Sequence, residues 1–294
     1  MDTTREPTGL ALYTKAAQKS SREVIYSYST SFGLATKLIQ PDIRQHIESI
    51  YAMVRVADEI VDGSAAEAAK GDKSLDPAKE IKDFEAECYK AMKTGYSTNL
   101  VLHAFAVTAR EVGIEKEIVK PFFDSMKMDL TDTEHDQESF KKYVYGSAEV
   151  VGLMCLQAFI KDRDYDSEQS QVLQEGALAL GSAFQKVNFL RDLSADFSRL
   201  GRSYFPGVKV DNFDEETKKR LVRDIDSELD KARNAIPLLP STAARAVRAA
   251  CELFAALNKK ISKTSSQELI STRISVANGN KFRILVTSYL GAGS

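Results

Sequence analysis

A long interval without proline restricts what this chain can fold into. The sequence holds seven prolines, and none lies between Pro121 and Pro206. Proline interrupts a helix because it lacks the backbone N–H and its ring clashes with the preceding turn. Apolar residues recur every three or four positions, and no segment alternates with the period of two that a strand needs. The chain is therefore predicted to be all-α, with long uninterrupted helices.

Start and stop signals divide the chain into successive helices. Pro41 opens a helix in which apolar residues from Ile43 to Val61 follow helical spacing, and Gly63 ends it. The small, polar and charged segment 64–77 is predicted to be a mobile surface loop. The other helices are expected at 10–39 (as one or two), 78–93, 98–112, 115–130, 137–160, 168–199, 214–234, 240–262 and 266–290. Without repeats or nucleotide-binding loops, residues 1–294 are interpreted as one domain with about 12 flexible residues at the N-terminus.

Charge and cysteine content exclude several classes of protein. The formal net charge is −2, which provides no field for recruiting nucleic acid. The three cysteines lie far apart, lack metal-binding spacing and leave one unpaired, as in a reduced cytoplasmic protein. The N-terminus lacks signal-peptide features, and the longest apolar run, 150–160, is too short to span a bilayer. We expect a cytoplasmic protein whose contact with the membrane is at most peripheral.

Polar side chains form a stripe on the helix predicted at 168–199. Gln185, Asn188, Asp192 and Asp196 follow the spacing i, i+3, i+7 and i+11, which places them on one helix face. The preceding segment 176–184 is apolar and small, so this face is expected to point inward. Burying even a neutral polar group without a partner costs roughly 2 to 7 kcal/mol. The stripe therefore requires cations.

A second acidic motif makes the first one interpretable. Asp58 and Asp62 stand four residues apart on one helix face, with Arg55 one turn earlier. A single motif of this kind is usually a solvated helix end, but two such motifs can face each other across a helical bundle. Two like charges about 4 Å apart repel by about 4 kcal/mol at an effective dielectric near 20. Mg²⁺, or alternatively Mn²⁺, would relieve this repulsion, and Arg55 with Arg191 would suit a diphosphate.

Together these motifs resemble the squalene/phytoene synthase family, and most closely its bacterial phytoene synthases of carotenoid biosynthesis. The resemblance covers nearly the whole chain. It rests on the segments at 28–39, 50–62, 143–152, 183–206 and 273–276. The combination of two acidic motifs with QxxNxxRDxxxD and the following GRxYFP is highly specific.

The resemblance implies a class I isoprenoid synthase fold, a single-domain helical bundle around a central cavity. It implies that the metal ligands are Asp58, Asp62, Asn188, Asp192 and Asp196. It implies that substrate is bound by Tyr28, Ser29, Ser31, Phe32, Tyr51, Arg55, Gln185, Arg191 and Arg273. Catalytic roles would belong to the four aspartates and to Tyr143.

One segment departs from the family pattern. Relatives often have a tyrosine near the positions of Leu253 and Phe254, which leaves open any role for a phenol there. Tyr28 likewise stands where relatives often have histidine. Neither difference touches the predicted metal ligands.

The reaction that the resemblance implies is the condensation of two geranylgeranyl diphosphates. One substrate ionises, the second captures its cation, and proton loss closes a cyclopropyl diphosphate that rearranges to phytoene. Diphosphate would be the general base. No nicotinamide-binding fingerprint is present, so NADPH is not expected. A downstream carotenoid desaturase is a candidate partner.

Three alternatives remain at this point. The first is a C15 enzyme that makes dehydrosqualene or squalene, although small residues at Gly33, Ala35 and Thr36 favour a C20 chain. The second is an HD-type phosphohydrolase, suggested by His135 and Asp136, although Thr133 or Asp136 is more simply the N-cap of the following helix. The third is a non-catalytic assembly factor of the same family, which the two intact acidic motifs disfavour.

Overall fold

The structure is a computed structural model that describes residues 9–72, 74–195, 203–272 and 274, without the side chains of 30, 31, 195 and 210. Every named element in these ranges is helical, and an isolated bridge joins Glu134 to Ser203. The elements are α1 (Gly9–Tyr28), α2 (Thr30–Thr36), α3 (Pro41–Val61), α4 (Ser64–Gly71), α5 (Pro77–Thr94), α6 (Leu100–Val112), α7 (Lys116–Met128), α8 (Gln137–Val144), η1 (Tyr145–Glu149), α9 (Val150–Ile160), α10 (Ser167–Ala195), η3 (Val210–Asn212), α11 (Glu215–Ala235), η4 (Ile236–Leu238), α12 (Ser241–Lys263) and α13 (Ser266–Ser271). The all-α prediction is confirmed.

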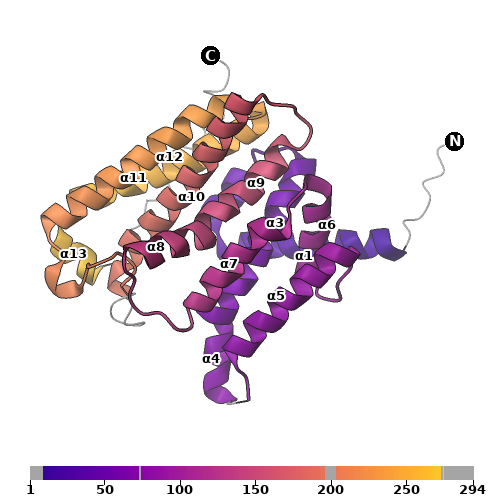
Figure 1. The fold of residues 1–294 in the computed structure, drawn as a ribbon, viewed down its shortest axis with the longest axis horizontal. Coiled ribbons are helices and arrows are strands. Elements are labelled where there is room, and N and C mark those ends of the chain that lie inside the picture. The colour runs from indigo at the N-terminus through magenta and orange to yellow at the C-terminus, as the bar shows by residue number, and fades with distance from the viewer. Residues whose placement is uncertain (1–8, 73, 196–202, 273, 275–294) are drawn as a thin grey trace.

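The helices pack in two groups that meet along α9 and α10. Helices α10, α11 and α12 contact one another and lie side by side, with α13 at one end of this group (Figure 1). Helix α3 packs against α1, α5, α6, α7 and α9 in the other group. Each group has its own apolar cluster of buried side chains, one centred on α3, α5 to α7 and α9 and the other on α8 and α10 to α12. Helix α10 contacts α9 directly and thereby joins the groups.

Capping side chains explain where several helices begin. Asp76, Asn99 and Asp214 each accept hydrogen bonds from backbone N–H groups in the first turn of α5, α6 and α11. Asp136 accepts from the backbone N–H of Glu138 and Ser139 at the start of α8, as expected for an N-cap. Such caps satisfy N–H groups that have no partner within the helix.

The helical segment Gln137–Ile160 changes its winding in the middle. Residues Tyr145–Glu149 form a π-helix between α8 and α9. Gly146 lies so close to the Pro121 carbonyl that a Cβ there would collide with it, so glycine is required for this contact with α7. By length and composition alone, Gln137–Ile160 could cross a membrane, whereas the apolar run 150–160 taken by itself is too short. It packs against α7 and α10 as a core helix of this fold.

Two predicted segments differ from the structure. Residues 64–71 form the helix α4 instead of part of a loop. The helix predicted at 266–290 ends at Ser271, because Thr272 has an extended backbone and the described Ile274 is not helical. The predicted end of the helix at 168–199 and the remainder of 266–290 lie outside the described residues, as do residues 1–8 of the predicted flexible N-terminus.

Candidate active site

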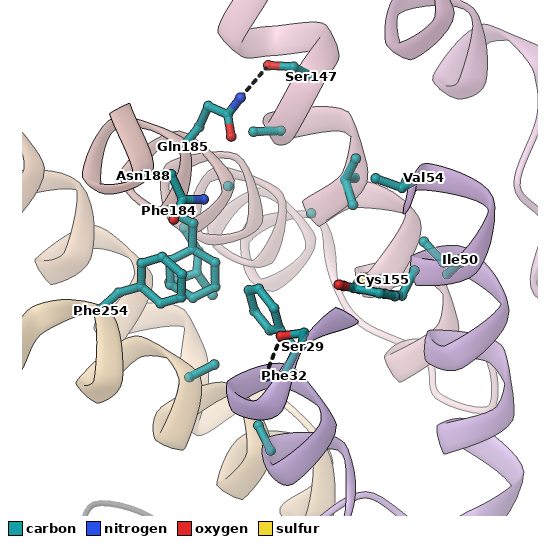
Figure 2. A pocket seen from close by; sticks show the side chains of 18 of the residues that line it. Ser29, Phe32, Ile50, Val54, Ser147, Cys155, Phe184, Gln185, Asn188 and Phe254 are labelled. Atoms are coloured by element: carbon teal, nitrogen blue, oxygen red, sulfur yellow. Dashed lines mark hydrogen bonds between the residues drawn. The ribbon is translucent and has the colours of Figure 1, made fainter. Parts of the chain in front are cut away.

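A cavity of about 1130 Å³ lies among α2, α3, η1, α9, α10 and α12 (Figure 2). Sites for small ligands usually measure roughly 300 to 1,000 Å³, so this cavity suits an unusually large ligand or two ligands. Its lining extends along α10 from Leu173 to Asp192, which is roughly 28 Å at ~1.5 Å per residue. The cavity is thus long as well as large.

One end of the cavity is polar. Asp58 lines it from the last turn of α3, which contains no basic residue, and Asp62 lines it as the residue that caps the C-terminus of this helix. Asn188 and Asp192 line it from α10, and the Gln185 amide donates to Ser147 Oγ at 3.3 Å (Figure 2). The structure therefore brings the described members of both acidic motifs to one cavity. Asp196, the last member of the α10 stripe, lies outside the described residues.

The rest of the lining is apolar and small. The far end is formed mainly by aliphatic and small side chains of α9 to α12 and η4, among them Phe159, Leu173, Ala177, Ala235 and Leu239. No charged residue occurs among the described lining residues at this end. A ligand that fills the cavity must combine a long apolar body with a polar head.

Aromatic rings form the wall next to the polar end. The Phe32 ring from α2 lies 6.3 Å from Tyr51, 5.8 Å from Phe184 and 5.7 Å from Phe254, measured between ring centroids. Phe184 and Phe254 stack at 3.8 Å (Figure 2). The segment that departs from the family pattern thus places a phenyl ring, Phe254, in the cavity wall.

A second aromatic group surrounds Tyr143, which is buried and lines the cavity. Its hydroxyl donates to the carboxylate of Asp129, with distances of 2.8 and 3.1 Å to the two oxygens. The ring contacts His135, Phe189 and Tyr204 with centroid distances of 5.0, 6.1 and 5.4 Å. Burial and the neighbouring Asp129 hold the pKa of Tyr143 well above its usual value, so the phenol stays protonated.

Both predicted diphosphate-binding arginines contact carboxylates. Arg55 pairs with Glu59 one turn later, and its guanidinium lies 4.4 Å from the centre of the Tyr28 ring. Arg191 donates through Nε to both oxygens of Asp192 at 3.1 Å and also through its terminal nitrogen. These pairs balance charge locally when no ligand is bound. A ligand that carries both a cation and an anion could exchange with them.

Among the described residues that line the cavity, two buried polar atoms have no hydrogen-bond partner. They are the Nε donor of Arg55 and the Oδ1 acceptor of Asn188. Leaving such a group buried and unpaired costs about 1 to 3 kcal/mol. An anion would satisfy Arg55, and a cation would satisfy Asn188.

Burial raises the pKa of Asp58 to about 7, with Asp62 adding to the shift and Arg55 opposing it. Burial also raises the pKa of Tyr51. Oxygen donors of the Asp and Asn type are those that Mg²⁺ prefers, so Asp58, Asp62, Asn188 and Asp192 fit this ion chemically. Among the described residues, however, no three acidic, His or Cys side chains lie close enough to form a preformed metal cluster.

The other predicted site residues are placed as follows. Ser29 lines the cavity, and its Oγ also accepts from the Phe32 backbone N–H as the N-cap of α2. Ala35 and Thr36 line the cavity, but Gly33 instead allows close contact with the Tyr26 ring. The Ser31 side chain and Arg273 lie outside what the structure describes.

Comparison with known proteins identifies the family. Residues 25–279 match the squalene/phytoene synthase family. The chain belongs to this family. A member from Paracoccus sp. called 15-cis-phytoene synthase is 26% identical over 279 residues, which cover 90% of this chain and 88% of the relative. The 15-cis-phytoene synthase of Enterobacter agglomerans is 27% identical over 282 residues, covering 88% of this chain and 90% of the relative.

Solved structures of squalene/phytoene synthase type share the fold. A dehydrosqualene synthase crystallised with a ligand has a TM-score of 0.75 at 18% identity and covers 96% of this chain and 99% of its own. A squalene synthase from Alicyclobacillus acidocaldarius has a TM-score of 0.72 at 20% identity, with coverages of 86% and 95%. The predicted isoprenoid synthase helical fold is confirmed.

Membership in the squalene/phytoene synthase family overturns the HD-type phosphohydrolase alternative. His46 is buried and bonded to Thr108, and His103 is bonded to Thr14. His135 stacks on Tyr204 and contacts Tyr143, and so belongs to the aromatic wall.

Sequence reasoning missed several residues of this family member's cavity. Asp129, Phe184, Phe189 and Tyr204 line it, and Phe254 was noted only as a departure from the family pattern. Phe184, Phe189 and Tyr204 lie within the segment 183–206, on which the family resemblance rests. Their place in that segment could have indicated that they belong to the cavity. Asp129 had no signal of its own, because only the fold brings it to Tyr143.

Proposed function

We propose that this protein condenses two geranylgeranyl diphosphates head to head, through a cyclopropyl diphosphate, to phytoene in a Mg²⁺-dependent reaction. The observation that carries the proposal is the cavity itself, in which one polar end continues into a long apolar body. Membership in the squalene/phytoene synthase family supports a prenyltransferase-type enzyme that acts on prenyl diphosphates. The names of the Paracoccus and Enterobacter relatives support phytoene as the product.

The polar end has the donors and acceptors that a metal-bound diphosphate needs. Asp58, Asp62, Asn188 and Asp192 would hold the ion, while Arg55 and Arg191 would bind the diphosphate oxygens. When bound, Mg²⁺ would supply Lewis acidity toward the departing diphosphate. The arginines would leave their present carboxylate partners for the diphosphate, which frees Asp192 for the ion.

The apolar body would keep water away from the carbocations. Aromatic faces stabilise a nearby cation by roughly 0.5 to 2 kcal/mol each. Phe32, Tyr51 and Tyr143 line the cavity near the polar end, where ionisation would occur. Diphosphate would serve as the general base in this proposal.

The cavity is long enough to hold a C20 substrate. An extended C20 prenyl chain measures roughly 20 Å from C–C bonds of about 1.5 Å, which is less than the length of the α10 lining. Ala35 and Thr36 line the cavity beyond Phe32 and leave space beside it. A C15 chain would also fit this length, and the relative turnover of the two substrates distinguishes them.

The test incubates purified protein with Mg²⁺ and either geranylgeranyl or farnesyl diphosphate, without NADPH, and identifies the hydrocarbon by mass. We expect a C40 hydrocarbon from the C20 substrate and much slower turnover of the C15 substrate. A C30 product formed faster than the C40 product would overturn the choice of substrate. No hydrocarbon from either substrate would instead favour the non-catalytic alternative.

A further inference from the structure

Asp129 is a buried carboxylate that belongs to neither acidic motif and is not among the predicted metal-binding or substrate-binding residues. Asp129 is 6% exposed, follows the last residue of α7 and lines the cavity. Its carboxylate accepts the hydroxyl proton of Tyr143 at 2.8 and 3.1 Å. A buried carboxylate costs several kcal/mol unless it gains such contacts. Its retention in a cavity wall therefore needs an explanation beyond packing.

Tyr143 is held rigidly in the same wall. Ser125 of α7 donates to the Tyr143 backbone carbonyl at 3.1 Å, just before the π-helix begins. The ring lies against His135, Phe189 and Tyr204, so its rotation is restricted. With the ring and backbone fixed in this way, the remaining freedom of the side chain is the direction of its O–H bond. Asp129 sets that direction.

The charges around Tyr143 determine what its oxygen can do. Asp129 from α7 and Asp62 from α3 both disfavour the phenolate, as does burial, so Tyr143 remains a neutral phenol. A hydrogen bond from this phenol to a carboxylate is charge-assisted, and it polarises the O–H bond. The oxygen lone pairs then lie away from Asp129 and carry increased negative character.

We propose that Asp129 is a positioning residue that turns the Tyr143 oxygen lone pairs toward the cavity, where they stabilise positive charge in the prenyl substrate. This inference rests on the proposed condensation, because the reaction develops a carbocation near the polar end. Asp129 acts through Tyr143 and does not itself touch substrate or metal. The pair thus adds an electrostatic contribution that is in place before the cation forms.

The test measures steady-state kinetics with geranylgeranyl diphosphate for Asp129→Asn, Tyr143→Phe and the double variant. Losing a charge-assisted hydrogen bond corresponds to roughly a 10- to 100-fold lower kcat. We expect this loss in Asp129→Asn, whose amide oxygen still accepts the hydrogen bond but carries no charge. KM and the Mg²⁺ concentration for half-maximal rate should stay within about twofold, since the diphosphate and metal residues are unchanged. The double variant should be no slower than Tyr143→Phe, because the two residues act as a unit.

Controls separate this role from the alternatives. Asp132→Asn changes a nearby carboxylate that instead accepts from Thr131, and it should keep the wild-type kcat. An unchanged kcat in Asp129→Asn, a strongly raised Mg²⁺ requirement, or multiplicative losses in the double variant would overturn the inference. Asp129→Ser replaces Asp129→Asn if the latter does not fold, and failure of both to fold would show a purely structural role. Absence of hydrocarbon from the wild-type enzyme would refute the proposed function instead.

Discussion

Asp58 is a carboxyl group held where its charge is unfavourable. It lies in the cavity wall, burial raises its pKa to about 7, and Asp62 and Glu59 add to the shift. Arg55, the cation that opposes this shift, is shared with Glu59 and with the Tyr28 ring. An ionised Asp58 is therefore poorly compensated in the protein alone. Strongly shifted carboxyl groups in a cavity are typical of functional sites.

The first prediction concerns Asp58 and Asp192. Replacement of either by Asn removes a charge that the proposed site needs, while the shape of the side chain is kept. We expect turnover of geranylgeranyl diphosphate to fall by roughly 100-fold or more, with helical content unchanged in circular dichroism. Asp42→Asn is the matched control, because Asp42 is an exposed residue in the first turn of the same helix α3. Full activity of either site variant would refute the assignment.

At the level of elements, sequence predicts the long amphipathic helices well. Their apolar spacing, prolines and capping residues are local, as for α3, which begins at Pro41. Helix α4 was missed because it buries no residue and so shows no apolar period. Its alanines have the highest helix propensity, but composition alone resembled a loop. The π-helix and the pairing of Asp129 with Tyr143 depend on tertiary contacts, which leave no local pattern.

Helix α4 is connected to the site through one side chain. The Ser64 backbone N–H at its start donates to Glu59 Oε2 at 2.9 Å, and Glu59 also pairs with Arg55. Diphosphate that binds Arg55 would release Glu59 from the ion pair, and the whole carboxylate charge of Glu59 would then hold the start of α4 through the Ser64 N–H. The segment 64–77, predicted as a mobile loop, is therefore expected to respond to ligand as a lid.

The second prediction is that Mg²⁺ with diphosphate protects this segment from trypsin. Cleavage after Lys70 should slow several-fold when both are added, while cleavage after Arg163, exposed between α9 and α10, should not change. Glu59→Gln should weaken the protection, since a neutral amide oxygen accepts the Ser64 N–H less strongly than the carboxylate does. Equal cleavage at Lys70 with and without ligand would contradict the lid.

For the whole molecule, the cavity occupies space that a packed core would otherwise fill. Within the described part of the chain, Asn188 and Arg55 keep buried atoms without a hydrogen-bond partner, and Asp58 is costly to ionise. The folded protein therefore carries a free-energy cost that ligand binding should recover. The spacing of the acidic residues in the sequence predicts the polar end of the cavity. The width and length of the cavity depend on how the helices pack, so only the structure shows them.

The third prediction relates stability to pH. The pKa of Asp58 in the folded state is about 7, against an ordinary value of 3.8, so folding favours its protonated form. Its contribution to stability is present at low pH and is lost as pH rises toward 7, by at most about 1.4 kcal/mol per pH unit. The Tm of the metal-free protein should fall over this range, and less so in Asp58→Asn.

Mg²⁺ with diphosphate should raise Tm more at about pH 8 than at about pH 6, because at the lower pH the ion must displace a proton. An equal rise in Tm at both pH values would show that the protonation of Asp58 does not oppose binding of the ion.

The last turn of α3 places Asp58 and Asp62 at the negative end of the helix macrodipole, with no basic residue in that turn. Cations are favoured at this end of a helix, so each carboxylate here interacts unfavourably with the α3 dipole by roughly 0.3 to 1 kcal/mol. A divalent cation at the polar end would reverse the sign of this interaction and favour the end of the helix. The same field repels a bare diphosphate. Substrate is therefore expected to enter most readily as its magnesium complex, or after the ion has bound.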